Sequence, residues 1–112
     1  MNKKYRLKKN YDIEKLVKAR LSVGNMYFVI YYGESEITTP RFAFSVSKKL
    51  GNAVVRNKEK RALREILRCN SSIVIDLDYL IIEKSKALSL SYQEKEKQIT
   101  YLLRKIIKQR RK

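Results

Sequence analysis

Residues 56–68 place positive charge and apolar side chains on opposite sides of one predicted helix. At about 100° per residue, one arc carries only cations and an amide, from Arg56, Asn57, Lys60, Arg61, Arg64 and Arg68. The opposite arc carries Val55, Ala62, Leu63 and Ile66. An amphipathic helix of this kind buries its apolar side against another element. The pattern therefore predicts a helix that lies along a sheet and turns a cationic face outward.

This cationic arc is self-repelling. Arg56, Lys60 and Arg64 follow one another at spacings of four, and each like-charge pair at that spacing costs a helix a few tenths of a kcal/mol. Glu59 and Glu65 lie off the arc and do not neutralise its centre. Arginine predominates, and its planar guanidinium suits bidentate contacts with phosphate. We infer that an anionic partner supplies the missing counter-charge.

The whole chain shares this excess of positive charge. Its 112 residues include 27 Lys and Arg against 11 Asp and Glu, a net charge of +16 with a pI near 10.1. The basic residues concentrate in residues 1–20, 41–68 and 104–112. Such a chain favours polyanions, with nucleic acid the first candidate and an anionic membrane surface the second. The longest apolar run, Met26–Tyr32, is too short for a transmembrane helix.

Capping signals and periodicity predict three helices and three strands. Asn10 can cap a helix over residues 11–21, and Asn52 can cap the helix with the cationic arc. The expected strands, rich in aromatic and β-branched residues, are Met26–Tyr32, Arg41–Val46 and one within Ile73–Ile82, where the signal is strongest at Tyr79–Ile82. Ser91 and Glu94 form a capping-box pattern. They open a last helix with an apolar stripe of Ile99, Leu102, Leu103, Ile106 and Ile107.

These elements predict a single small α+β domain, in which helices pack on a sheet. The sequence contains three glycines and one proline, so the connections between elements should be short. We expect one domain over residues 1–112. Residues 104–112 form a basic segment that we expect to be a tail prone to fraying.

The residue inventory argues against chemistry by the protein itself. Cys69 is the only cysteine and histidine is absent, which excludes an intrachain disulfide, a Cys/His zinc site and His-dependent nucleophilic catalysis. Asp76 and Asp78 would share one face of a strand, but no third acid follows at a spacing typical of a two-metal site. We therefore predict no catalytic residue, no metal ligand and no cofactor held by protein ligands alone.

A second candidate phosphate-binding feature directly precedes the cationic helix. The N-terminus of a helix offers unpaired backbone N–H groups to an anion, and Lys48 and Lys49 add charge beside it. Gly51 would let a ligand approach the backbone closely. The same residues also suit an ordinary turn between a strand and a helix, and both interpretations stay open.

The stretch Arg41–Arg68, RFAFSVSKKLGNAVVRNKEKRALREILR, closely resembles the signature of the bacterial ribonuclease P protein subunit. The hallmark of that family is an RNR-type motif, here Arg56-Asn57-Lys58-x-Lys60-Arg61-x-x-Arg64-Glu65-x-x-Arg68. Its third position holds Lys58 where the family commonly has arginine. The preceding SVSKKxGNAVVRN matches throughout, and looser similarity covers nearly the whole chain.

The resemblance implies an α-β-β-β-α-β-α order with a left-handed βαβ crossover, the fold of the second domain of a small-subunit ribosomal protein. In the family, a catalytic RNA removes the 5′ leader of precursor tRNA with magnesium bound through the RNA. The protein binds the catalytic RNA and the leader. The implied setting is the cytoplasm, with one protein per RNA and no membrane partner.

Residue roles follow from the same resemblance. It assigns catalytic-RNA binding to Lys48, Lys49, Asn52, Arg56, Asn57, Lys58, Lys60, Arg61, Arg64 and Arg68. It places the precursor-tRNA leader in a cleft between the first helix and the sheet, lined by Ile13, Val17 and Tyr31. Family members commonly carry two phenylalanines where this chain has Ile13 and Val17, and these two residues equally suit core packing.

Two other kinds of protein share part of this pattern. A generic RNA-binding module, such as a ribosomal protein or an RNA chaperone, would have a similar composition and no role in cleavage. A DNA-binding protein would insert its basic helix into the major groove, but the helix here is expected to lie lengthwise on a sheet. The RNR-type signature favours the ribonuclease P subunit over both.

Overall fold

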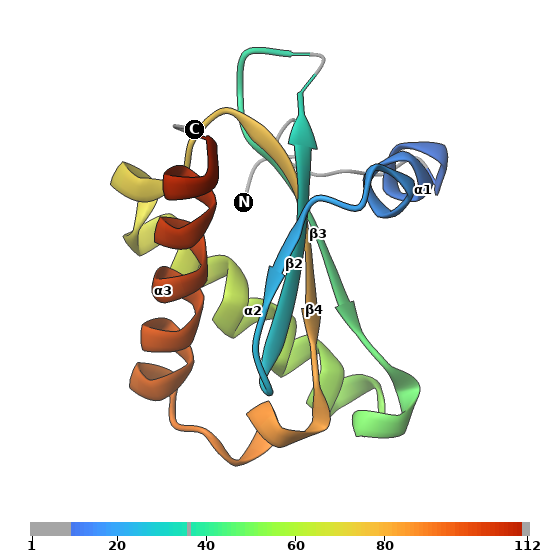
Figure 1. Ribbon diagram of the computed structural model, residues 1–112. Coiled ribbons are helices and arrows are strands. Elements are labelled where there is room, and N and C mark those ends of the chain that lie inside the picture. The colour runs from blue at the N-terminus through green and yellow to red at the C-terminus, as the bar shows by residue number, and fades with distance from the viewer. Residues whose placement is uncertain (1–9, 36, 111–112) are drawn as a thin grey trace.

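The computed structural model describes residues 10–35 and 37–110 and has the expected α-β-β-β-α-β-α order (Figure 1). The helices are α1 (Asn10–Ala19), α2 (Ala53–Cys69) and α3 (Tyr92–Arg110). The strands are β1 (Ser22–Gly24), β2 (Phe28–Glu34), β3 (Arg41–Val46) and β4 (Leu77–Glu83). Short 3-10 helices are η2 (Lys48–Leu50), η3 (Ser71–Ile73) and η4 (Ser85–Ser89).

The four strands form one mixed sheet in the order β1-β2-β4-β3. β2 pairs antiparallel with both β1 and β4, whereas β3 and β4 run parallel and are connected through α2. The register aligns Leu80 of β4 with Tyr31 on one side and Ala43 on the other. This single α+β domain therefore contains the βαβ unit that the expected fold requires.

The main core lies between the sheet and the two long helices, which cover the same face (Figure 1). Leu63 and Ile66 of α2 are fully buried there, as are Ile99 and Leu102 of α3. The rings of Phe42 and Tyr79 stack with centroids 5.3 Å apart. Burying large apolar side chains in this way is the dominant stabilising contribution, roughly 1.5–3 kcal/mol for each one.

The opposite face of the sheet is covered by α1 (Figure 1). Leu16 packs there against Ala43 and Leu80, with Ile13, Tyr31 and Ile82 partly buried around them. A Cβ at Gly33 would come within 3.0 Å of Leu16 Cδ2, so the bare backbone at Gly33 lets α1 approach β2 closely. The small cluster under α1 thus fixes where this helix crosses the sheet.

Helix ends follow the predicted capping residues. Asn52 Oδ1 accepts a 3.1 Å hydrogen bond from the Val55 backbone N–H, so Asn52 caps α2. Ser91 and Glu94 bond reciprocally at the start of α3, at 2.9 and 3.2 Å, which confirms the capping box. α3 continues to Arg110, so residues 104–110 are helical.

The structure differs from the sequence prediction at several places. β2 covers Phe28–Glu34 and not Met26–Tyr32, so it lies two residues later in the chain. α1 ends at Ala19 because Arg20 adopts a left-handed conformation at φ 59°, and Leu21 is consequently 48% exposed. The short strand β1 was not predicted from periodicity, since three residues carry too little pattern. β4 begins only at Leu77, after Ser71–Ile73 has formed η3.

Candidate nucleic-acid interface

The connection between β3 and α2 forms the first part of the interface. Lys48 and Lys49 lie on η2 with exposed side chains, directly before the exposed cap Asn52. Gly51 has φ 152°, and a Cβ there would come within 2.9 Å of Val55. The glycine is therefore required for packing against α2. Two cations and the start of a helix are exposed together at this end of the sheet.

The cationic face of α2, as we name Arg56, Asn57, Lys60, Arg61, Arg64 and Arg68, continues from this connection. Asn57, Arg61 and Arg68 are exposed, and the other three are half-buried along the flank of the helix. The Arg64 guanidinium lies 5.5 Å from the ring centroid of Phe44 on β3. This cation–π contact holds the positive charge beside the edge strand. Lys58 is exposed as well.

The buried side of α2 is rotated relative to the prediction. Leu63 and Ile66 are buried as expected, and Leu67 joins them at 2% exposed. Val55, expected in the core, is 37% exposed, and Ala62 is only half-buried. The reason is that Glu59 faces inward, where a partner from α3 neutralises it. Three members of the cationic face, Arg56, Lys60 and Arg64, are consequently half-buried, and Arg64 contacts β3 through Phe44.

That partner is Lys95, whose Nζ lies 2.6 Å from Glu59 Oε1, and both side chains are buried. Glu83 on β4 is also buried, and its carboxyl group lies beside that of Glu59. Burial and the neighbouring Glu59 raise the pKa of Glu83 to about 8. Sequence reasoning missed this cluster, although Glu59 falls on the apolar side of the helical wheel.

One end of the cationic face is partly neutralised within the helix. The Arg68 guanidinium forms a bidentate ion pair with Glu65, including a 3.0 Å bond from Nε to Oε2. Glu65 thus neutralises Arg68 at the end of the cationic face and leaves the charge at the centre of the face without this partner. An exposed pair of this kind contributes little to stability, so Arg68 can exchange Glu65 for another anion.

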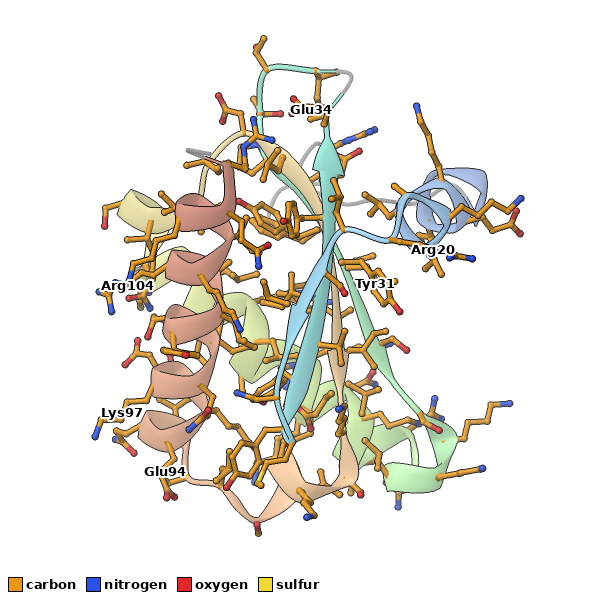
Figure 2. The ribbon with its side chains drawn as sticks, in the orientation of Figure 1. Arg20, Tyr31, Glu34, Glu94, Lys97 and Arg104 are labelled. Carbon is orange, nitrogen blue, oxygen red and sulfur yellow. The ribbon has the colours of Figure 1, made fainter. Side chains whose placement is uncertain are left out.

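The three residues predicted to line a leader cleft lie on the side of the sheet covered by α1. Ile13 and Tyr31 pack together with Leu16 in the small cluster, whereas Val17 is 41% exposed. Figure 2 shows Tyr31 projecting from β2 toward that side. Tyr31 is half-buried, so part of its ring is accessible. α1 and the sheet thus bring all three residues to one surface.

The structure places Asp76 and Asp78, the two acids that the sequence suggested as a pair, in different surroundings. Asp78 is buried and accepts hydrogen bonds from Arg41 at 2.8 and 2.7 Å, whereas Asp76 is exposed before β4. Within residues 10–35 and 37–110, no three His, Cys, Asp or Glu side chains are grouped so that they could hold a metal ion. The carboxylates described here therefore do not fit a protein-held magnesium ion. In the same ranges, no helix is long and apolar enough to cross a bilayer.

Comparison with known proteins gives one consistent family. The chain matches the family described as Ribonuclease P over residues 1–107. It is 40% identical over 104 residues to the ribonuclease P protein component of Streptococcus agalactiae, covering 93% of this chain and 95% of that one. It is 39% identical over 105 residues to the component from Staphylococcus aureus, covering 93% and 91%.

Solved structures agree with these sequence matches. The RNase P protein of Staphylococcus aureus superposes with a TM-score of 0.83 at 39% identity, over 89% of this chain and 93% of that one. The protein from Thermotoga maritima gives a TM-score of 0.82 at 28% identity, over 89% and 96%. The similarity thus includes nearly the whole α+β domain and the cationic helix.

Proposed function

The chain belongs to the bacterial ribonuclease P protein family and is a component of that tRNA 5′-processing endoribonuclease; on this premise we propose how its surfaces serve the reaction. The cationic face of α2 binds the catalytic RNA, and the surface between α1 and the sheet holds the 5′ leader of precursor tRNA. The observation that carries the proposal is the cationic face itself, which is fixed along β3 with its outer cations exposed.

Phosphate contacts dominate the binding of the catalytic RNA. Arg56, Arg61 and Arg64 present guanidinium groups from successive turns, and bidentate contacts with phosphate are favourable for this side chain. Lys48 and Lys49 extend the charge beyond the helix start. Asn52 contributes through its position at the cap, since its side-chain oxygen is already bonded to the Val55 N–H. Asn57, Lys58, Lys60 and Arg68 complete the binding surface.

The leader follows the side of the sheet where Tyr31 is accessible. An aromatic ring stacked on a base contributes about 1–3 kcal/mol without requiring a particular sequence. Val17 on α1 offers apolar contact to the leader, and Ile13 holds α1 in place by packing in the small cluster between this helix and the sheet. Because Ile13 and Val17 lack an aromatic face, stacking in this protein depends mainly on Tyr31.

The chemistry of cleavage belongs to the RNA in this proposal. Asp78 is occupied by Arg41 and Glu59 by Lys95, so neither carboxylate is placed to hold magnesium. Magnesium is bound through the RNA, and the protein acts by binding and positioning. The assembly contains one protein per catalytic RNA and operates in the cytoplasm.

The test is cleavage of precursor tRNA by a bacterial ribonuclease P RNA at low magnesium, with and without this chain. We expect the protein to stimulate cleavage and the product to have the mature 5′ end. The Lys86→Gln variant, which removes one exposed charge outside α2, should stimulate cleavage as strongly as the wild-type protein. Tight RNA binding without stimulation would instead indicate a generic RNA-binding module.

A further inference from the structure

The outer face of α3 carries positive charge that the proposed function does not use. This face consists of Lys97, Tyr101, Arg104, Lys105 and Lys108, which fall on one side of the helix and are all exposed. Figure 2 shows Lys97 and Arg104 projecting from α3 away from the sheet. Tyr101 lies in the middle of the cations and is 61% exposed. Four cations thus surround one accessible aromatic ring.

Most of these cations lack neutralising partners. Within residues 10–35 and 37–110, none of the four lies in an ion pair with an acidic side chain. Of the nearest acids along the helix, Glu96 accepts a 2.9 Å bond from Asn70, whereas Glu94 accepts the Ser91 backbone N–H and also interacts with the charge of Lys97. The unneutralised charge of the outer face therefore comes mainly from Arg104, Lys105 and Lys108.

Helix stability alone does not account for this arrangement. The helix dipole favours cations in the last turn, which includes Lys108, but it gives no advantage to Lys97 in the second turn of α3. Arg104 and Lys108 repel each other at a spacing of four. An exposed tyrosine among them contributes no burial. The same set of residues suits an RNA strand, because phosphates neutralise the cations while an unpaired base stacks on the ring.

The outer face of α3 is separate from the cationic face of α2. One flank of α2 contacts α3 through the Glu59–Lys95 pair and the Asn70–Glu96 bond. The other flank packs along β3, where Arg64 lies over Phe44. The two cationic surfaces therefore come from different helices, and Arg68 at the end of the α2 face is close enough to Tyr92 at the start of α3 to interact with it.

We propose that the outer face of α3 is a second RNA-contact surface, which binds backbone phosphates on both sides of an unpaired base stacked on Tyr101. An anionic membrane fits less well. Membrane-surface helices insert Leu, Phe or Trp side chains, whereas the described outer face has tyrosine as its single large apolar group. The occupant is the catalytic RNA rather than the precursor tRNA, because α2 and α3 cover one face of the sheet, whereas the proposed leader surface lies beside α1 on the opposite face (Figure 1).

The experiment measures binding to each of these two RNAs separately, across a range of salt concentrations. The variant Lys97→Gln/Arg104→Gln/Lys105→Gln should weaken binding to the catalytic RNA by tenfold or more. It should also make the slope of log K against log salt shallower by about 2 to 3, as expected for three lost phosphate contacts. Tyr101→Ala should weaken binding to the same RNA by roughly 5- to 100-fold.

Two controls keep the result specific. Lys105→Gln should reduce RNA affinity. Lys86→Gln, which also removes one exposed lysine charge, should leave RNA affinity unchanged. Circular dichroism should show unchanged helix content, because all substituted side chains are exposed. Wild-type affinity and slope for the catalytic RNA in the triple variant would overturn the inference, while weakening by Arg61→Gln would still support the proposed function. Binding of phosphatidylserine vesicles through this face, with RNA binding unaffected, would overturn it too.

Discussion

Lys95 of α3 and Glu59 of α2 form an ion pair of 2.6 Å in the interior, and both side chains are less than 10% exposed. Glu83 of β4 lies buried beside them. The pair joins the helix that carries the cationic face to the helix that carries the second cationic surface. Two buried carboxyl groups thus lie close together at the junction of α2, α3 and the sheet, and only Glu59 is bonded to the Lys95 ammonium group.

Breaking this pair should destabilise the fold strongly. Lys95→Met leaves Glu59 buried without its counter-charge, and we expect the free energy of unfolding to fall by about 3–5 kcal/mol. Adding Glu59→Leu should recover most of this loss, because the double variant replaces the pair with apolar contacts. Urea denaturation of both single variants and the double variant measures the coupling. Simple additivity of the two effects would contradict a direct interaction.

Stability should decrease as the pH rises toward 8. Burial and the nearby Glu59 raise the pKa of Glu83 from its ordinary 4.5 to about 8. Between these values the folded protein holds a proton that the unfolded chain releases, so the free energy of unfolding falls with increasing pH. The loss is on the order of a few kcal/mol. Denaturation between pH 5 and pH 9 measures it.

The Glu83→Gln variant isolates this effect, since an amide of similar shape cannot ionise. Its free energy of unfolding should vary much less between pH 5 and pH 8 than that of the wild type. Asp76→Asn, at an exposed acid, should retain the wild-type pH dependence. An equal pH dependence in wild type and Glu83→Gln would show that Glu83 does not titrate in this range.

Arg64 should contribute to RNA affinity more than to folding. Arg64→Ala removes a guanidinium that Phe44 holds at the edge of the cationic face, and we expect catalytic-RNA affinity to fall by about 1–2 kcal/mol. Arg64→Lys keeps the charge but loses the planar guanidinium group. Its RNA affinity should therefore lie between those of the wild type and Arg64→Ala. Filter binding measures the affinities. If Arg64→Ala lost its folded circular dichroism spectrum, the assignment of Arg64 to the interface would be wrong.

The exposed position of Val17 allows a gain-of-function test of the leader surface. Val17→Phe places an aromatic ring where the wild-type side chain is 41% exposed, and one added stacking contact should strengthen precursor-tRNA binding by about 1 kcal/mol. Tyr31→Ala should weaken it. Affinity for mature tRNA, which has no leader, should not change in either variant. Leu21→Phe, outside α1, serves as the control. An equal gain in precursor-tRNA affinity from this variant would contradict the placement of the leader beside Val17.

The features that were predictable from sequence are mainly local. The Asn52 cap and the Ser91–Glu94 capping box depend on residues three apart, and both are confirmed. The strand Arg41–Val46 has the predicted bounds, because its large apolar residues recur regularly at every second position. The RNR-type pattern lies within one helix, so its residues share a face in any fold that keeps the helix intact.

The missed features depend on contacts between distant parts of the chain. Glu59 and Lys95 lie on different helices, and their pairing decides how α2 is rotated and why Val55 is exposed. Likewise, the occupation of Asp78 by Arg41 requires β3 and β4 to be neighbours, which periodicity does not reveal. These pairings follow only from the sheet order and the helix packing.

Cys69 allows the most direct test of the claim that α2 faces the catalytic RNA. It is the only cysteine of the chain, is exposed, and follows Arg68 at the end of α2. An iron chelate that generates hydroxyl radicals, attached to its thiol, should cleave the catalytic RNA within one or two short segments. The same chelate attached through Lys86→Cys in a Cys69→Ser background should leave those segments intact. Equal cleavage from both positions, or none from Cys69, would contradict the assignment of α2 to the RNA interface.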